Sequence, residues 1–244
     1  MAKIFKVGGC IRDKFLGLDS KDIDFTFVCE NSQSVEEGWV EMKTWLIEKG
    51  FTIFLETPDC FTIRAKFPVG HQHEGLVADF VMARKEVGYI EGTRRPILEI
   101  GTLHDDLIRR DFTVNALAED IDGKLIDPFD GLLDLKDGLL QTPTDPITTM
   151  MDDPLRVLRA LRFTITKDFQ ISRELFEAMK QPGILKKLEM TVSQERIRDE
   201  VEKMMKFNTV RSIRLLMDMD GDIPGFLELV FKGNMWLKPT TALK

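Results

Sequence analysis

Several features that mark common protein classes are scarce or missing in this sequence. The 244 residues include only three cysteines, and no two of them have a CxxC spacing. This argues against a disulfide scaffold and for reduced thiols in a reducing compartment. No apolar stretch approaches the roughly 20 residues that a membrane-spanning helix needs, and no internal repeat or low-complexity tract interrupts the chain. We therefore expect a soluble cytoplasmic protein.

An excess of positive charge is also missing. The chain has 34 basic and 41 acidic residues, and its net charge is −7. A protein that coats nucleic acid is expected to be basic, so any RNA binding must use a local basic face. Because 43% of the residues are hydrophobic and 31% are charged, the chain can bury one large core or two smaller ones.

The spacing of the apolar residues changes once along the chain. Up to about Asp127, short β-rich runs alternate with turns and two helical stretches, which predicts an α/β head built on one sheet. Beyond Asp130 the pattern is helical. We expect strands at 4–7, 23–28, 51–55, 61–67, 76–82 and 124–126, and helices at 11–16, 35–49, 154–163, 173–179, 193–205 and 209–217.

The first chemical motif is the segment 7–13, where a predicted strand ends on Gly8 and Gly9 and a helix follows. Backbone N–H groups and the positive end of a helix would face a ligand at this turn, and a triphosphate suits that position. Arg12 lies in the first helical turn and is placed to reach a phosphate oxygen. Taken alone, a glycine pair at a strand end more often marks a simple turn.

The second motif is the strand that follows Asp22. Side chains alternate between the faces of a strand, so Asp22 and Asp24 are expected on the face opposite Ile23, Phe25 and Phe27. Two close carboxylates repel each other unless a cation lies between them, and Mg²⁺ prefers such oxygen ligands. Two such ions about 4 Å apart would activate an attacking hydroxyl and stabilise a leaving pyrophosphate.

Together these motifs resemble the opening signature of the class II tRNA nucleotidyltransferases and the bacterial poly(A) polymerases. The resemblance continues in the same order along residues 4 to 205. Its later parts are Asp106-Leu107-Ile108-Arg109-Arg110-Asp111, Ile126-Asp127-Pro128-Phe129-Asp130-Gly131, Asp153-Pro154-Leu155-Arg156-Val157-Leu158-Arg159-Ala160-Leu161-Arg162 and Glu195-Arg196-Ile197.

The resemblance implies roles for the matching residues. Asp22 and Asp24 would be the catalytic acids that bind Mg²⁺, and Gly9 and Arg12 would contact the triphosphate of the incoming nucleotide. Arg110 would also hold the nucleotide, with Asp111 beside it. Without the resemblance, residues 109–111 would be interpreted as a surface ion-pair network.

Asp79, in the predicted strand 76–82, is a candidate third acid that would deprotonate the RNA hydroxyl. Alternatively, it pairs with a neighbouring arginine such as Arg84.

Asp153 and the three arginines after it predict a base-reading helix. Asp153 and Pro154 also suit an N-cap followed by the first helical position. At 100° per residue, Asp153, Arg156, Arg159 and Arg162 form one ridge and the leucines lie on the other side.

Cytosine and adenine both present an amino donor beside a ring-nitrogen acceptor. Asp153 would accept from the amino group and Arg156 would donate to the ring nitrogen. Uracil and guanine present the reverse order, at a cost of about 1–3 kcal/mol for each opposed group. The resemblance assigns the same role to both residues, with Arg159 and Arg162 as further nucleotide contacts. Asp152 stands where the family usually has Glu, so the template is set slightly differently.

The implied fold is α+β: a nucleotidyltransferase-type head with a mixed β-sheet and flanking helices, then an all-α neck and a truncated body. The expected division is a catalytic head at 1–128, a helical neck at 129–205 and a short remnant of the RNA-binding body at 206–244. Recognition of the tRNA 3′ end would then be reduced, supplied by a second subunit in a homo-oligomer, or directed at a smaller RNA. Segment 66–75, with His71 and His73, is expected to be a mobile, solvated loop rather than a metal site.

The implied activity is addition of CCA, as CMP and AMP from CTP and ATP, to the 3′ end of tRNA with release of pyrophosphate. Poly(A) polymerase is the first alternative, although segment 59–64 lacks the Gly-Arg-Arg-Phe type of stretch that we associate with that branch. A partial enzyme that adds CC or A alone is the second. An inactive RNA-binding remnant is the third, and the presence of both Asp22 and Asp24 argues against it.

Overall fold

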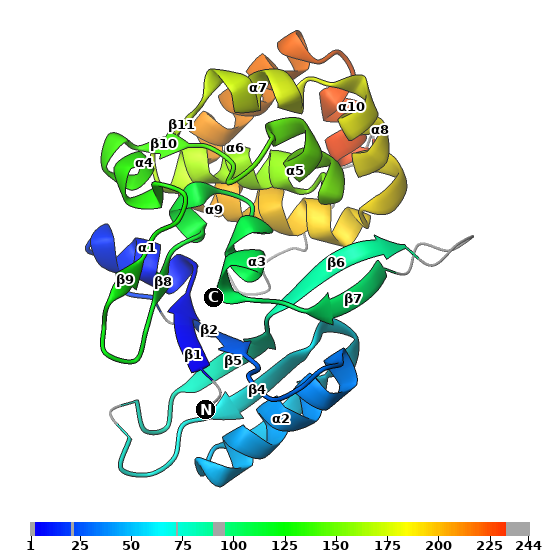
Figure 1. The fold of residues 1–244 in the computed structure, drawn as a ribbon. Helices are drawn as coiled ribbons and strands as arrows, with labels where there is room; N and C mark the ends of the chain where they lie inside the picture. The colour runs from blue at the N-terminus through cyan, green and yellow to red at the C-terminus, as the bar shows by residue number, and fades with distance from the viewer. Residues whose placement is uncertain (1–2, 21, 72, 90–95, 233–244) are drawn as a thin grey trace, which may run out of the picture. The chain divides into compact units, whose positions relative to one another are not determined.

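The computed structural model describes residues 3–20, 22–71, 73–89 and 96–232. The chain divides into two compact units, Met1–Asp137 and Gly138–Lys244, which we call the head unit and the helical unit (Figure 1). The expected three-part division at 128/129 and 205/206 stays a prediction, and residues 233–244 of its last part lie outside the described residues.

A seven-stranded mixed sheet forms the centre of the head unit. The strand order is β3-β4-β5-β2-β1-β8-β9; the pair β2 and β5 is parallel and the other pairs are antiparallel. This confirms the expected α+β class with a mixed sheet. The strands are β1 (Lys3–Val7), β2 (Ile23–Val28), β3 (Thr52–Thr57), β4 (Thr62–Lys66), β5 (Val77–Met82), β8 (Ala118–Glu119) and β9 (Leu125–Ile126).

The two faces of this sheet carry separate apolar clusters. The larger cluster contains Phe25 and Phe27 of β2 and packs against Met42 and Leu46 of α2 (Val35–Glu48). The smaller cluster, on the other face, contains Val7 of β1 with residues of α3 and β8. The Ser34 side chain accepts the Glu37 N–H and so begins α2, as expected for an N-cap serine. Figure 1 shows α2 running along the sheet.

The rest of the head unit consists of short elements. They are α1 (Gly9–Phe15), the hairpin β6 (Arg84–Tyr89) and β7 (Pro96–Ile100), α3 (Leu103–Ile108), α4 (Gly131–Asp137) and two 3₁₀ helices at Pro58–Cys60 and Thr113–Asn115. The hairpin, α3 and α4 were not predicted, because each is too short or too polar to show a clear apolar period.

The helical unit is built around α6 (Arg156–Thr166), which packs along α9 (Gln194–Asp222). Val157, Leu158 and Leu161 of α6 are fully buried, whereas its three arginines stay partly exposed, which confirms the predicted two-sided helix. The other elements are α5 (Pro146–Asp152), α7 (Arg173–Met179), α8 (Pro182–Thr191), α10 (Phe226–Phe231), β10 (Leu139–Leu140) and β11 (Gln170–Ile171).

Two boundaries differ from the sequence-based expectation. α6 begins at Arg156, after a short turn through Asp153 and Pro154, so Asp153 is not the residue directly before the helix. α9 runs through the expected gap between 205 and 209, but Asn208 inside it has non-helical dihedral angles (φ −153°, ψ 95°). None of the helices in the described part of the chain is long and apolar enough to cross a membrane.

Candidate active site

The turn between β1 and α1 brings backbone close to a cationic side chain. Gly8 has φ +77°, and a Cβ at this position would lie 2.5 Å from Nη1 of Arg110. Two features favour glycine at this position. Its backbone has a positive φ, and a Cβ would displace the guanidinium end of Arg110. The predicted strand-glycine-helix motif thus places Arg110 against the turn that was expected to hold a triphosphate.

Two neighbouring strands place acidic residues side by side near this turn, and a third strand adds an arginine. Asp24 of β2 lies in register with Asp79 of β5, which lies in register with Arg64 of β4. Arg64 binds Asp79 through two hydrogen bonds, both of 2.6 Å. Asp79 thus pairs with Arg64 and not with Arg84, whose guanidinium donates to the Cys60 carbonyl.

The electrostatic environment of Asp24 suits a bound cation. Burial raises the pKa of Asp24, and the charges of Asp79 and Asp22 raise it further, while Arg110 and Arg64 lower it. A cation beside Asp22 and Asp24 would relieve this penalty. No group of three or more His, Cys, Asp or Glu side chains is arranged to hold a metal within the described residues. Mg²⁺, however, usually takes one or two carboxylates and completes its shell with water and phosphate, so the two carboxylates fit it.

Arg110 is fixed in place by two elements. Its Nη2 donates to Asp106 of α3 at 2.9 Å, and the same Asp106 oxygen accepts from Thr26 of β2 at 2.8 Å. Thr26 shares its sheet face with Asp24, because alternate residues of a strand face the same way. The Nε of Arg110 is buried and has no hydrogen-bond partner within the described residues. Arg110 is therefore both positioned beside Asp24 and incompletely satisfied.

Arg12 and Asp111 belong to one buried network. Nη1 of Arg12 donates to Asn115 at 2.6 Å, and Asn115 donates to Asp111 at 2.8 Å. Arg12 also binds Asp13 at 2.8 Å. Both Arg12 and Asp111 are only 7% exposed, so the predicted nucleotide contacts of these two residues would require this network to rearrange. The network itself holds α1 to the loop that follows Arg110.

Asp153 and Arg156 lie at the beginning of α6. The Asp153 carboxylate accepts the Leu155 N–H at 3.1 Å and forms an ion pair with Arg196 at 3.2 Å. Arg156 donates to the Thr149 carbonyl at 3.0 Å. Both side chains are partly exposed, so the helical unit presents a carboxylate and a guanidinium three residues apart. The assigned template function stays a prediction.

Arg159 and Arg162 differ in their surroundings. Arg162 donates to Glu200 of α9 at 2.5 Å, and its guanidinium lies 4.4 Å from the centre of the Phe163 ring. The Arg159 guanidinium lies 5.9 Å from the same ring. Arg162 thus joins α6 to α9, and a nucleotide contact by Arg162 would compete with this ion pair.

Segment 66–75 is more closely packed than expected. The His71 ring stacks on Phe67 at 4.7 Å, and Nδ1 of His71 accepts the His73 backbone N–H at 3.1 Å. Both histidine side chains are partly exposed and contact Phe67, so they are less open to solvent than in a fully solvated loop. That the segment is mobile stays a prediction. Val69, at 89% exposure, remains on the outside.

Several residues next to the site were missed in the sequence. Arg64 contacts Asp79, 15 positions away, and Asn115 contacts Arg12, 103 positions away. Asp106 contacts Arg110 only four positions away, within a segment to which the sequence assigned no role for Asp106. Thr26 lies two residues after Asp24 in the same strand. The alternation of side chains along a strand, which puts both residues on one face, is the local signal that pointed to Thr26.

Comparisons with known proteins find relatives over most of this chain. The chain is 35% identical over 208 residues to the mitochondrial CCA tRNA nucleotidyltransferase of Candida glabrata, covering 81% of this chain and 38% of that protein. It is 33% identical over 226 residues to the CCA-adding enzyme of Bacillus pumilus, covering 90% and 50%. The chain thus spans between about a third and a half of the length of these relatives.

A solved structure gives a similar result. The Thermotoga maritima CCA-adding enzyme complexed with tRNA matches with a TM-score of 0.70 and 26% identity, over 98% of this chain and 50% of that one. Residues 4–141, more than half of the chain, match the model of the poly A polymerase head domain, and the chain belongs to that family.

Proposed function

We propose that this chain is a metal-dependent nucleotidyltransferase that adds CMP and AMP from CTP and ATP to the 3′ end of tRNA, as CCA. The observation that carries the proposal is the placement of Asp24 on β2, next to Asp22, Asp79 and the guanidinium of Arg110. Relatives named as CCA-adding enzymes and tRNA nucleotidyltransferases support the substrate class.

Catalysis rests on charge and positioning. Asp22 and Asp24 would hold Mg²⁺, which when bound lowers the pKa of a primer hydroxyl and balances the charge of the leaving pyrophosphate. Arg110, held by Asp106, would bind triphosphate oxygens, and the backbone N–H groups after Gly8 and Gly9 would face them. Such pre-positioned charges act on the transition state without reorganising during the reaction.

Asp79 is less suited to act as a general base. Both oxygens of its carboxylate already accept hydrogen bonds from Arg64, and a charge-assisted bidentate pair of this kind holds the side chain in one orientation. We assign Asp79 and Arg64 a positioning role beside Asp24.

Base choice is assigned to Asp153 and Arg156. Asp153 would accept the amino group that cytosine and adenine share, and Arg156 would donate to the adjacent ring nitrogen. Binding of CTP or ATP requires Asp153 to exchange its exposed ion pair with Arg196 for the base. Such an exposed ion pair contributes at most about 1 kcal/mol of stability, so breaking it costs little of the binding free energy.

The experiment is incorporation with Mg²⁺, tRNA that lacks its 3′ terminus, and each labelled nucleotide in turn. The proposal predicts CMP and then AMP incorporation that stops after three additions. Long A tails would show a poly(A) polymerase, and addition of CC or A alone would show a partial enzyme. Tight tRNA binding without any incorporation would contradict the assigned catalysis and support an inactive RNA-binding protein.

A further inference from the structure

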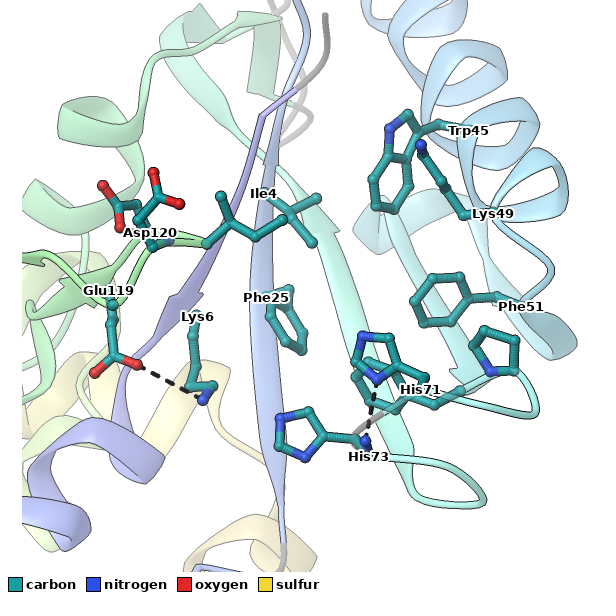
Figure 2. Close-up of a pocket in the computed structure, with 15 residues that line it drawn as sticks. Ile4, Lys6, Phe25, Trp45, Lys49, Phe51, His71, His73, Glu119 and Asp120 are labelled. Atoms are coloured by element: carbon teal, nitrogen blue, oxygen red, sulfur yellow. Dashed lines mark hydrogen bonds and ion pairs between the residues drawn. The ribbon is translucent and has the colours of Figure 1, made fainter.

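A cavity of about 580 Å³ opens in the head unit, away from the catalytic carboxylates (Figure 2). In the pairing of β1 with β2, Lys6 lies opposite Phe25, and Val7 lies opposite Asp24. Adjacent residues of a strand face opposite ways. Lys6 and Phe25 line the cavity, so the cavity and Asp24 lie on opposite faces of the sheet.

One wall of the cavity is aromatic. His71 stacks on Phe67 at 4.7 Å with an interplanar angle of 24°. Phe51 lies 5.0 Å from Phe67 and 6.1 Å from Trp45. Figure 2 shows Trp45, Phe51 and His71 along one side, with Phe25 at the centre. These rings offer flat faces of the kind on which a planar ligand stacks.

The two histidines of this wall carry ring N–H donors. The Nδ1 of His71 accepts the His73 backbone N–H, so the neutral ring carries its proton on Nε2. Burial lowers the pKa of His73, and the charges of Lys6 and His71 lower it further. Near neutral pH, His73 is therefore uncharged and suited to contact a neutral ligand.

The opposite wall is polar. Glu119 at the end of β8 and residues Asp120, Asp122 and Gly123 of the following turn line the cavity. Figure 2 shows Glu119 and Asp120 on the other side of Phe25 from Trp45 and Phe51. Glu119 pairs with Lys6 at 3.8 Å. Hydrogen-bond acceptors thus lie across the cavity from the imidazole donors.

We propose that this cavity binds a nucleobase, from free nucleoside or from an unpaired position of RNA. Its volume falls in the range of about 300–1,000 Å³ that is usual for small-molecule sites. Stacking on aromatic side chains tolerates any base. The donors and acceptors on opposite walls suit a nucleobase, whose edge carries both kinds of group, better than they suit a hydrocarbon ligand, which carries neither. The site is separate from the nucleotide site at Asp24 and goes beyond the proposed activity.

The test is a titration of the full chain with adenosine and cytidine in the presence of EDTA, followed by tryptophan fluorescence, to which Trp45 in the cavity wall contributes. Nucleosides lack the phosphates by which Arg110 and a metal would hold a nucleotide. We expect saturable quenching by both nucleosides and none by ribose 5-phosphate. Saturation absent at millimolar nucleoside, or equal quenching by ribose 5-phosphate, would overturn the proposal.

Two variants locate the bound base. His71→Ala removes a stacking face and should raise the Kd for adenosine by about fivefold or more. Arg110→Ala, on the other face of the sheet, should leave this Kd unchanged. If Arg110→Ala abolishes binding, or if His71→Ala has no effect while circular dichroism shows an intact fold, the base lies elsewhere and the proposal is wrong.

A last comparison identifies the source of the base. A single-stranded RNA octamer is compared, by competition with adenosine, with the same octamer carrying one abasic position. Stronger competition by the complete octamer indicates an RNA base, and equal competition indicates free nucleoside. No arm of this test needs a metal or turnover, so its failure is distinguishable from failure of the proposed transferase activity.

Discussion

The surroundings of Asp24 oppose its ionisation, whereas the proposed metal site needs its ionised carboxylate. Burial raises its pKa above the ordinary value of 3.8, and two further carboxylates, Asp79 and Asp22, add to this shift. For such a group, the stabilising contribution is complete at low pH and is lost as the pH rises through the raised pKa. At neutral pH the metal-free fold therefore carries an ionised carboxylate that it would be more stable without.

This predicts two opposite effects of Asp24→Asn. The metal-free variant should have a higher Tm than the wild type at pH 7, and the difference should shrink toward pH 4. Incorporation should fall by about 1,000-fold or more, since metal-ion catalysis supplies several kcal/mol and each 1.36 kcal/mol is tenfold in rate. Thermal denaturation in EDTA and a primer-extension assay measure these effects.

Asp59→Asn serves as the control, because Asp59 is an exposed acid of the same unit. It should change neither the Tm nor the rate. A lower Tm for Asp24→Asn would contradict the burial penalty, and a near-normal rate would exclude Asp24 as a metal ligand.

Gly8 offers a second prediction at the residue scale. Alanine at Gly8 would meet a φ of +77° and place its Cβ 2.5 Å from Arg110. Gly17 has a similar φ of +68° but nothing within 4 Å of a Cβ. Both substitutions cost about 1–2 kcal/mol of backbone strain, and Gly8→Ala also displaces Arg110.

We therefore expect Gly8→Ala to raise the Kd for CTP by about tenfold or more, the loss of one charge-assisted contact. Gly17→Ala should leave it unchanged. Isothermal titration of both variants with CTP measures the difference, and equal affinities would show that the approach of Arg110 to the turn is not used in nucleotide binding.

At the scale of elements, local sequence signals predicted where the helices begin and end better than they predicted which distant residues contact each other. α7 has the expected bounds, because the Ser172 side chain begins it by accepting the Leu175 N–H. Around Asn208 the expectation of two helices also has a physical basis: Asn208 leaves helical geometry and its side chain accepts the Arg211 N–H at 3.0 Å, as an N-cap does.

The parts of the site that the sequence did not reveal depend on strand pairing. Arg64 meets Asp79 because β4 and β5 are neighbours, and no spacing within either strand indicates that pairing. Asn115 lies 103 positions after Arg12 in the chain and connects it to Asp111. The proposed metal ligands were accessible to sequence reasoning because Asp22 and Asp24 lie two residues apart, where strand alternation alone predicts that they share one face.

The start of α6 gives the prediction for base choice. Asp153→Ala should lower the preference for CTP over UTP by about tenfold, because one opposed hydrogen-bonding group costs about 1–3 kcal/mol. Arg196→Ala removes the ion-pair partner of Asp153 but keeps the carboxylate, so the preference should persist. Incorporation measured with each nucleotide gives both ratios. Unchanged discrimination in Asp153→Ala would refute the template assignment.

At the scale of the whole molecule, each unit has its own buried residues. The head unit packs Phe25, Phe27 and Leu46 around α2, and the helical unit buries Leu161 of α6 and Met204 of α9. Units with separate cores are expected to unfold as separate cooperative transitions. The head unit contains Trp39 and Trp45, so the fluorescence of these two tryptophans reports on the head.

The ion pair of Arg162 with Glu200 is suited to test this separation. Burial acts to raise the pKa of Glu200, but the charge and hydrogen bond of Arg162, together with Lys203, outweigh it and lower that pKa. The resulting stabilisation is present above pH 4.5 and is lost as the pH falls through the lowered pKa. At pH 7 the pair therefore contributes in full to the helical unit.

Glu200→Ala should destabilise the helical unit by about 3 kcal/mol, since it leaves a mostly buried guanidinium without its partner. We expect urea unfolding of a Trp236→Phe background to show a lower midpoint by circular dichroism, while the fluorescence of Trp39 and Trp45 keeps its midpoint. Lys206→Ala, which breaks an exposed pair with Glu202, should change neither by more than about 0.5 kcal/mol. A fluorescence midpoint that moves together with the dichroism would show that the two units unfold as one.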